Sequence, residues 1–168
     1  YYGIYFNQAK ASIIDYAIIK NGTAGIHVFS SGVGPLSYAL TIRNTKLFNH
    51  ARYGLFLYDG ASVKGENVIS SRNGFHSLLV LNDSRFNFNH CDFLGFGSAQ
   101  SPAIGIRNYL NDPNETASIS EGVLYNSIIC GNLETEIILD TIIDFPGQLN
   151  LDIQNCFIQS EEEYSDAF

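Results

Sequence analysis

Methionine and tryptophan are absent from the 168 residues, proline occurs four times and cysteine three times. A chain of this length can bury a sizeable core, which rules out a small disulfide-stapled module. No apolar run approaches the 18 or so residues that would cross a membrane as a helix. Helical spacing of apolar residues is scarce as well, and glycine, asparagine, β-branched and aromatic residues dominate. The sequence therefore predicts an all-β protein.

Basic residues are also few: 9 Lys and Arg stand against 17 Asp and Glu, for a formal net charge of −8. This balance argues against binding to nucleic acid, which needs a basic surface. Hydrophobic residues make up 45% of the chain and charged residues 15%, which argues against disorder. We expect a piece of a longer protein, with one domain over residues 1–160 and an acidic loop or tail over residues 161–168.

One short apolar alternation returns six times along the chain. These anchors begin at Gly3, Gly25, Gly54, Ser77, Ala103 and Glu136. A second motif, with a polar residue, a small residue and then an apolar pair, alternates with them over residues 15–19, 44–48, 66–69, 90–94, 126–129 and 155–158. The repetition at irregular intervals predicts coils that keep their strands and vary their loops.

An antiparallel meander is the alternative for so many short strands. It would join neighbouring strands by two-residue Asn-Gly or Asp-Gly turns. Such pairs occur at Asn21, Asp59 and Asn73, but each follows a strand at the end of a coil. We therefore favour a parallel coil, in which each strand stacks about 4.8 Å from its counterpart one turn later.

With these two alternating motifs, the chain resembles the right-handed parallel β-helix shared by pectate lyases, polygalacturonases, phage tailspikes and many bacterial surface proteins. Residues 126–137 and 151–158 are similar to secreted or lipid-anchored β-helix repeat proteins of Bacteroidota-type bacteria. The resemblance covers essentially the whole chain. It implies about six coils and an extracytoplasmic location, either secreted or on the bacterial cell surface, and it leaves the ligand open.

Alternation within the anchors predicts which side chains face outward. The outward positions and their neighbours include six large apolar residues, a predicted partner-binding set: Tyr5, Phe29, Phe56, Tyr58, Leu79 and Leu81. Such a column is more apolar than solvent requires and marks contact with something. Three explanations stay open: a loop or further chain that folds over it, a partner protein, or carbohydrate stacked on the aromatic rings.

A second column is polar and recurs at the second motif. We predict an internal structural ladder of side chains that bond to each other along the axis: Asn44, Asn67, His90, Asn126 and Asn155. His90 is then a ladder member rather than a catalytic base. Cys91 and Cys156 share one coil position two coils apart, about 10 Å, which is too far for a disulfide. With Cys130, they are interpreted as small hydrophobic residues and not as zinc ligands.

The resemblance to polygalacturonases implies Asn-Thr-Asp, Asp-Asp, Gly-His-Gly and Arg-Ile-Lys motifs, and none is present. A calcium-dependent lyase needs carboxylates on one face, but Asp59, Glu66, Asp83 and Asp92 share no column on adjacent coils. We therefore predict no catalytic residue, metal or cofactor. Thr141, within Asp140-Thr141-Ile142, resembles the short O-glycosylation signal of Bacteroidota-type envelope proteins.

The function predicted first is a non-catalytic extracytoplasmic scaffold or surface protein that docks a partner protein or a glycan. The alternative is a polysaccharide-active enzyme, a lyase or glycoside hydrolase, whose active site lies partly outside this chain. Clustered bases over carboxylates would favour an acidic substrate, whereas the scattered bases and the negative net charge argue against one.

Overall fold

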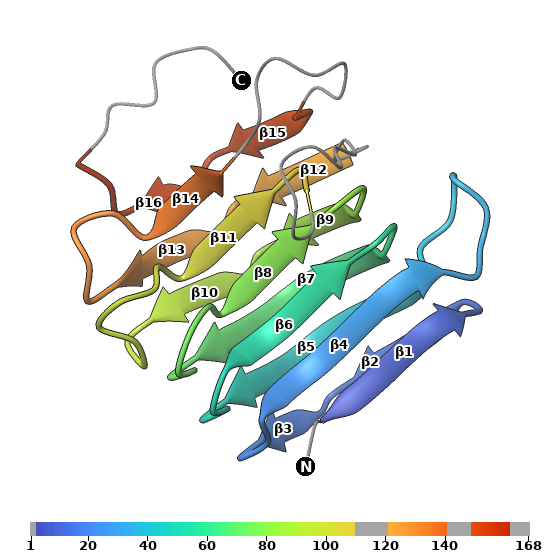
Figure 1. The fold of residues 1–168 in the computed structure, drawn as a ribbon, viewed down its shortest axis with the longest axis horizontal. Coiled ribbons are helices and arrows are strands. Elements are labelled where there is room, and N and C mark those ends of the chain that lie inside the picture. Colours follow the sequence, from blue (N-terminus) through green and yellow to red (C-terminus); the bar gives the residue numbers. More distant parts are fainter. Residues whose placement is uncertain (1–2, 110–120, 141–148, 162–168) are drawn as a thin grey trace.

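The structure is a computed structural model that describes residues 3–109, 121–140 and 149–161. Within these ranges the chain forms 16 strands. The described ranges contain no helix that is long and apolar enough to cross a membrane. The prediction of an all-β protein is confirmed, and the strands form two parallel sheets (Figure 1).

The first sheet contains six strands in the order β1-β4-β6-β8-β11-β14. Its members are β1 (Ile4–Ala9), β4 (Ala24–Ser31), β6 (Tyr53–Tyr58), β8 (Leu78–Leu81), β11 (Ile104–Arg107) and β14 (Ile137–Asp140). All neighbours in this sheet pair in parallel. Each strand pairs with the next strand that the chain contributes to this sheet. We call one passage of the chain through both sheets a turn.

The second sheet contains ten strands: β2 (Ser12–Asp15), β3 (Ile18–Lys20), β5 (Leu40–Phe48), β7 (Ser62–Ser71), β9 (Arg85–Asn89), β10 (Asp92–Gly95), β12 (Glu121–Tyr125), β13 (Ile128–Gly131), β15 (Leu151–Gln154) and β16 (Phe157–Ile158). Its main path runs β15-β12-β9-β7-β10-β13-β16, and β5 joins β7 to β2 and β3. These pairings are parallel too.

The predicted anchors pair with one another in register. The first apolar residue of each anchor belongs to a single column: Ile4, Ile26, Leu55, Leu78, Ile104 and Ile137. Because every described pairing is parallel, the antiparallel meander is wrong. The second motif is confirmed as strand as well, since Ile19 pairs with Leu47, and Phe93 pairs with Ile129.

A third strand segment in each turn escaped prediction. The chain passes twice through the second sheet between successive strands of the first, as β9 and β10 do, and the two passes are fused in the long β5 and β7. The missed segment alternates inward and outward residues, as in Leu40-Thr41-Ile42, over only four or five positions. So short an alternation does not distinguish a strand from a loop.

The second sheet is curled because the chain turns a corner between its two passes. The corner residue has a φ between 49° and 55° at every turn: Tyr16, Asn44, Asn67, His90, Asn126 and Asn155. Asparagine tolerates this left-handed conformation better than most residues, which explains why it recurs there. Five of these six residues form the predicted ladder. The left-handed backbone conformation at the corner therefore explains why asparagine recurs in this column, which hydrogen bonding alone does not explain.

The core lies between the two sheets. Its largest fully buried side chains are Phe86, Phe88, Phe93, Ile26, Leu40, Ile42, Leu47, Leu55, Leu57, Leu78, Ile104 and Ile106. A small residue faces a large one at Gly65 of β7, which pairs with Phe88 of β9, and a β-carbon at Gly65 would overlap the Phe88 ring. At this pair the packing of the core therefore depends on complementary volumes in neighbouring turns.

Candidate functional site

Aromatic side chains gather on the outer side of the first sheet. Tyr5, His27 and Phe56 occupy paired positions of β1, β4 and β6, next to the inward column, and therefore point away from the core. Phe29 and Tyr58 pair two positions further along β4 and β6. Four of the six residues predicted to bind a partner thus lie together on one face.

The rings of these residues are packed against each other. The His27 ring lies edge-on to both neighbours, with ring centroids 6.2 Å from Tyr5 and 5.2 Å from Phe56. The Phe56 and Tyr58 rings stack at 4.6 Å, and Phe29 lies 4.9 Å from Tyr58. The hydroxyls of Tyr5 and Tyr58 are 3.3 Å apart and share a hydrogen bond. Burial, followed by that hydrogen bond, raises the pKa of Tyr58 to about 12, so its hydroxyl stays protonated at neutral pH.

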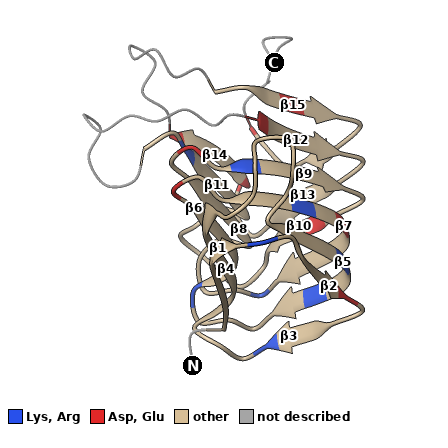
Figure 2. Cartoon of the chain, turned by 90° about the vertical axis from the view of Figure 1, so that its right-hand side faces the viewer, with Lys and Arg blue, Asp and Glu red and all other residues tan. Residues whose placement is uncertain are grey.

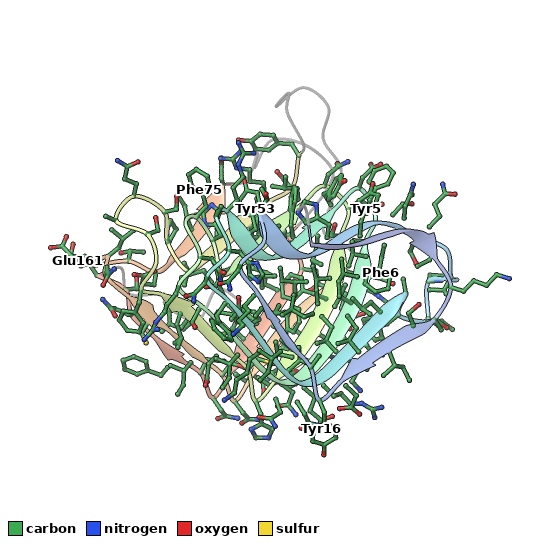
Figure 3. The ribbon with its side chains drawn as sticks, turned by 90° about the horizontal axis from the view of Figure 1, so that it is seen from below. Tyr5, Phe6, Tyr16, Tyr53, Phe75 and Glu161 are labelled. Atoms are coloured by element: carbon green, nitrogen blue, oxygen red, sulfur yellow. The ribbon has the colours of Figure 1, made fainter. Side chains whose placement is uncertain are left out.

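Three further rings belong to this group, and sequence analysis missed them. The Tyr53 ring lies 5.0 Å from Phe56, 5.9 Å from Phe75 and 6.2 Å from His76, on which it stacks with an interplanar angle of 6°. Figure 3 shows Tyr5, Tyr53 and Phe75 along one side of the molecule. The sequence could have indicated two of them, because Tyr53 and His76 immediately precede the anchors that begin at residues 54 and 77. We name the eight residues the aromatic face: Tyr5, His27, Phe29, Tyr53, Phe56, Tyr58, Phe75 and His76.

Accessibility differs along the predicted partner-binding set. Tyr5 is 53% exposed, whereas Leu79 and Leu81 of β8 are each only 7% exposed. The expectation that these two leucines offer contact surface is therefore wrong. Alternation correctly placed Leu79 outside the inward column, but it could not show how closely neighbouring side chains cover it.

A hollow opens beside the aromatic face at Gly105 of β11. Gly105 pairs with Leu79 on one side and with Ile138 on the other, so the outward column lacks a side chain at this turn. The hollow has a volume of about 220 Å³ and is lined by residues that include His76, Leu79, Ile138 and Asp140. His76 and Leu79 close in on the place of the missing side chain, since a β-carbon at Gly105 would stand 3.1 Å from both, and the hollow lies beside them.

Polar groups border this hollow. Arg107 and Asp140 are register partners, and Nε of Arg107 lies 2.9 Å from Oδ2 of Asp140. The Tyr109 hydroxyl donates a hydrogen bond to the same oxygen at 2.7 Å, and the Arg107 guanidinium lies 5.7 Å from the Tyr109 ring centroid. The hydrogen bond to Asp140, followed by desolvation, raises the pKa of Tyr109. The three side chains hold each other in place with their charges compensated.

His76 presents a neutral imidazole to the hollow. Its Nδ1 lies 2.7 Å from the Pro102 carbonyl, which can only accept, so Nδ1 carries the proton and Nε2 keeps a lone pair. A β-carbon at Gly105 would stand 3.2 Å from Nε2. Burial lowers the pKa of His76 below 6.5, and the charge of Arg107 adds to this effect against the Pro102 hydrogen bond. The ring is therefore a hydrogen-bond acceptor at neutral pH.

His27 lies within the aromatic face and has an unusual nitrogen. Its Nε2 is buried and has no hydrogen-bond partner among the groups that the structure describes. Burial lowers the pKa of His27, so the ring is neutral. Because rings of Tyr5 and Phe56 flank it edge-on, His27 acts as one more aromatic ring in the face.

Glu136 is a buried carboxylate that holds two backbone amides. Its Oε2 accepts from the Ala103 amide at 2.6 Å, and its Oε1 accepts from the Leu133 amide at 2.7 Å. A β-carbon at Gly95 or Gly131 would overlap this carboxylate. Glu136 is fully buried, and these contacts make it a support of the corner before β14.

The predicted ladder is only partly hydrogen-bonded, and it lies outside. Nδ2 of Asn67 donates to Oδ1 of Asn44 at 2.8 Å, but Nδ2 of Asn126 donates to Asn89 and not to His90. Asn67, His90, Asn126 and Asn155 are exposed and Asn44 is half-buried. The expectation of an internal ladder is therefore wrong. The small residue that follows each corner, as in Thr45 or Cys91, takes the inward position instead.

Cysteines and charges add no reactive centre to the described part of this face. Cys91, Cys130 and Cys156 are free thiols, and burial raises the pKa of Cys91 to about 12. Lysine, arginine and acidic residues are scattered along the described ribbon without a continuous band of one sign (Figure 2). Within the described ranges, His, Cys, Asp and Glu do not gather into a group able to hold a metal ion. Thr141, predicted to be O-glycosylated, and most of the acidic tail lie outside the described residues.

Comparison of the chain with protein-family models, curated proteins and solved structures finds no match. The aromatic face and the hollow beside it are therefore the features that indicate a function.

Proposed function

We propose that this chain is a section of a right-handed parallel β-helix that serves as a non-catalytic, extracytoplasmic scaffold. In this proposal it docks a glycan or a partner protein on the aromatic face. The parallel pairing of successive strands supports the right-handed winding of this β-helix, because parallel crossover connections are almost always right-handed. Support for the location comes from the resemblance of residues 126–137 and 151–158 to secreted and lipid-anchored repeat proteins.

The observation that carries the docking function is the continuity of the aromatic face. Its rings span β1, β4 and β6 and the segment before β8, and each contacts at least one other ring. A folding role alone does not need this many aromatic rings on the outer side of a sheet. Rigid rings also lose little conformational entropy when they bind, which favours recognition.

The experiment compares two variants in which outward apolar side chains of the two sheets are replaced by serine. F56S/Y58S removes two stacked rings from the aromatic face, and I128S removes a large apolar residue, 44% exposed, from the second sheet. Each protein is incubated with neutral and acidic polysaccharides, with and without calcium, and both retention and released products are scored. For a protein partner, a photo-crosslinking residue replaces Tyr58 or Ile128 in the full-length protein, and adducts are compared.

We expect retention or crosslinking that F56S/Y58S abolishes and I128S leaves intact, with both variants folded by circular dichroism. Equal retention in the two variants, together with equal adducts at the two crosslinking positions, would contradict the docking proposal. Released oligosaccharides would contradict the non-catalytic assignment and would favour the polysaccharide-active enzyme.

A further inference from the structure

The hollow over Gly105 has the size of a single small ligand. Its volume of about 220 Å³ equals that of roughly seven water molecules in the liquid. Sites for drug-sized molecules are larger, about 300–1,000 Å³. A β-carbon at Gly105 would stand 3.1 Å from both Cε1 of His76 and Cδ1 of Leu79. A side chain at this position would therefore press against His76 and Leu79 at the edge of the hollow.

The polar border of the hollow suits hydroxyl groups. Oδ2 of Asp140 already accepts from Arg107 and Tyr109, and a carboxylate has about four acceptor sites, so capacity remains. Arg107 uses Nε toward Asp140 and still carries the N–H groups of its terminal nitrogens. An acceptor and a donor side by side, each about half exposed, can bind two adjacent hydroxyls of one molecule. Nε2 of His76 supplies a third position, as an acceptor.

The charge of this border indicates a neutral ligand. Arg107, the one cation among the described residues of the lining, is already paired with Asp140 at 2.9 Å. A carboxylate or phosphate on the ligand would lie beside the negative charge of Asp140, which already compensates the charge of Arg107. The net charge of −8 on the chain opposes an anion further.

Apolar groups complete the hollow on its other sides. Leu79 and the half-exposed Ile138 flank Gly105 in the outward column. Ile138 offers carbon surface to the C–H groups of a ring, while the polar groups face its hydroxyls. Leu79, only 7% exposed, closes the opposite side of the hollow. This combination, apolar sides with a few converging donors and acceptors, is the usual form of a small-molecule site.

The hollow is also continuous with the aromatic face. The His76 ring that borders it stacks on Tyr53, and Tyr53 lies 5.0 Å from Phe56. A chain molecule with one unit in the hollow would extend over these rings. A glycan fits this arrangement better than a protein, because each of its units carries both hydroxyls and a C–H face.

We infer that the hollow binds one neutral pyranose unit of a glycan whose neighbouring units lie on the aromatic face. This inference rests on the proposed docking function and narrows it to the glycan. Asp140 and Arg107 bind adjacent hydroxyls, His76 accepts from a third, and the ring lies in the hollow that Gly105 lines. No bond is made or broken in this step.

The test uses affinity electrophoresis of the folded protein in gels that contain neutral or acidic polysaccharides. G105V places side-chain carbons against His76 and Leu79 at the hollow. D140N keeps the shape of the side chain but removes the charge that holds Arg107. The matched control is D152N, because the Tyr125 hydroxyl donates to Asp152 on the second sheet as Tyr109 does to Asp140. Circular dichroism and thermal unfolding confirm that each variant is folded, and D140N serves if G105V does not fold.

We expect the wild-type protein to be retarded by at least one neutral polysaccharide, with the apparent affinity reduced at least tenfold by G105V or D140N and unchanged by D152N. Retardation that F56S/Y58S abolishes and both hollow variants leave intact would overturn the inference while the docking function stands. Retardation by acidic polysaccharides alone, or by none, would overturn the neutral pyranose as ligand. If no polysaccharide retards the protein, crosslinking at Tyr58 decides separately whether the aromatic face docks a protein.

Discussion

The backbone amide of His50 donates a hydrogen bond to Oδ1 of Asn73 at 3.2 Å, and one turn earlier the amide of Gly22 donates to Nδ1 of His50 at the same distance. The two side chains thus hold the same backbone position at successive turns. Nε2 of His50 lies 3.2 Å from the Ile19 carbonyl, to which it donates. Both nitrogens of a neutral, buried imidazole are used, and protonation of Nδ1 would remove the acceptor for Gly22.

Stability is expected to decrease in mild acid because of His50. Burial lowers the pKa of His50 below 6.5, against the opposing effect of the hydrogen bond that its ring donates to the Ile19 carbonyl. In the unfolded chain the ring takes up a proton near pH 6.5, whereas the folded form stays neutral, so the free energy of unfolding falls as pH decreases below that value. The lowered pKa values of His27 and His76 act in the same direction.

H50N tests this assignment, because asparagine already performs the task at the next turn without titrating. Urea unfolding at pH 7.5 and 5.0 should show a smaller loss of stability in H50N than in the wild-type protein. H90N, at an exposed corner, should keep the wild-type difference. An unchanged pH dependence in H50N would show that His50 is not responsible.

G65A is expected to destabilise the fold by about 1–3 kcal/mol, as overpacking of a core does. The added methyl would overlap the fully buried Phe88 ring. Combining G65A with F88L should cost less than the sum of the two single variants, because leucine frees part of the same volume. G34A is the control, since a β-carbon at Gly34 meets no atom within 4 Å. Additive effects in the double-mutant cycle would argue against direct competition for space.

The corner at Asn67 is expected to depend more on backbone conformation than on its side-chain hydrogen bond. Asn67 has a φ of 55°, which costs an alanine about 1 kcal/mol and a glycine almost nothing. N67A should therefore be less stable than N67G, although both lose the hydrogen bond to Asn44. Chemical denaturation measures the difference, and equal losses in the two variants would assign the effect to the hydrogen bond.

E136Q is expected to lower the free energy of unfolding by about 1–3 kcal/mol, the cost of a buried polar group without a partner. Two backbone amides point at the two carboxylate oxygens of Glu136, and glutamine offers an acceptor to only one of them. E134Q, at an exposed position two residues earlier, is the matched control. A loss of the same size in both variants would show that the amide contacts do not matter.

The sequence by itself determined the parallel strands and most of their register. Alternation in a strand is local, so the inward series that begins at Ile4 and Ile26 can be aligned residue by residue from the amino-acid pattern alone. The same alternation placed Tyr5, Phe56 and Tyr58 on an outer face. It also overlooked the third strand of each turn, where the alternating run is too short to distinguish from a loop.

Tertiary structure alone decided what depends on space between turns. That Leu79 is covered, that Gly105 leaves a hollow and that Tyr53 and His76 join the aromatic face all follow from side chains on neighbouring turns, far apart in sequence. The asparagine column was visible in the sequence, but its outward position follows from the left-handed corner that each Asn occupies. Residue patterns record which side of a strand is apolar, whereas the volumes and backbone angles that shape a site exist only once the turns are stacked.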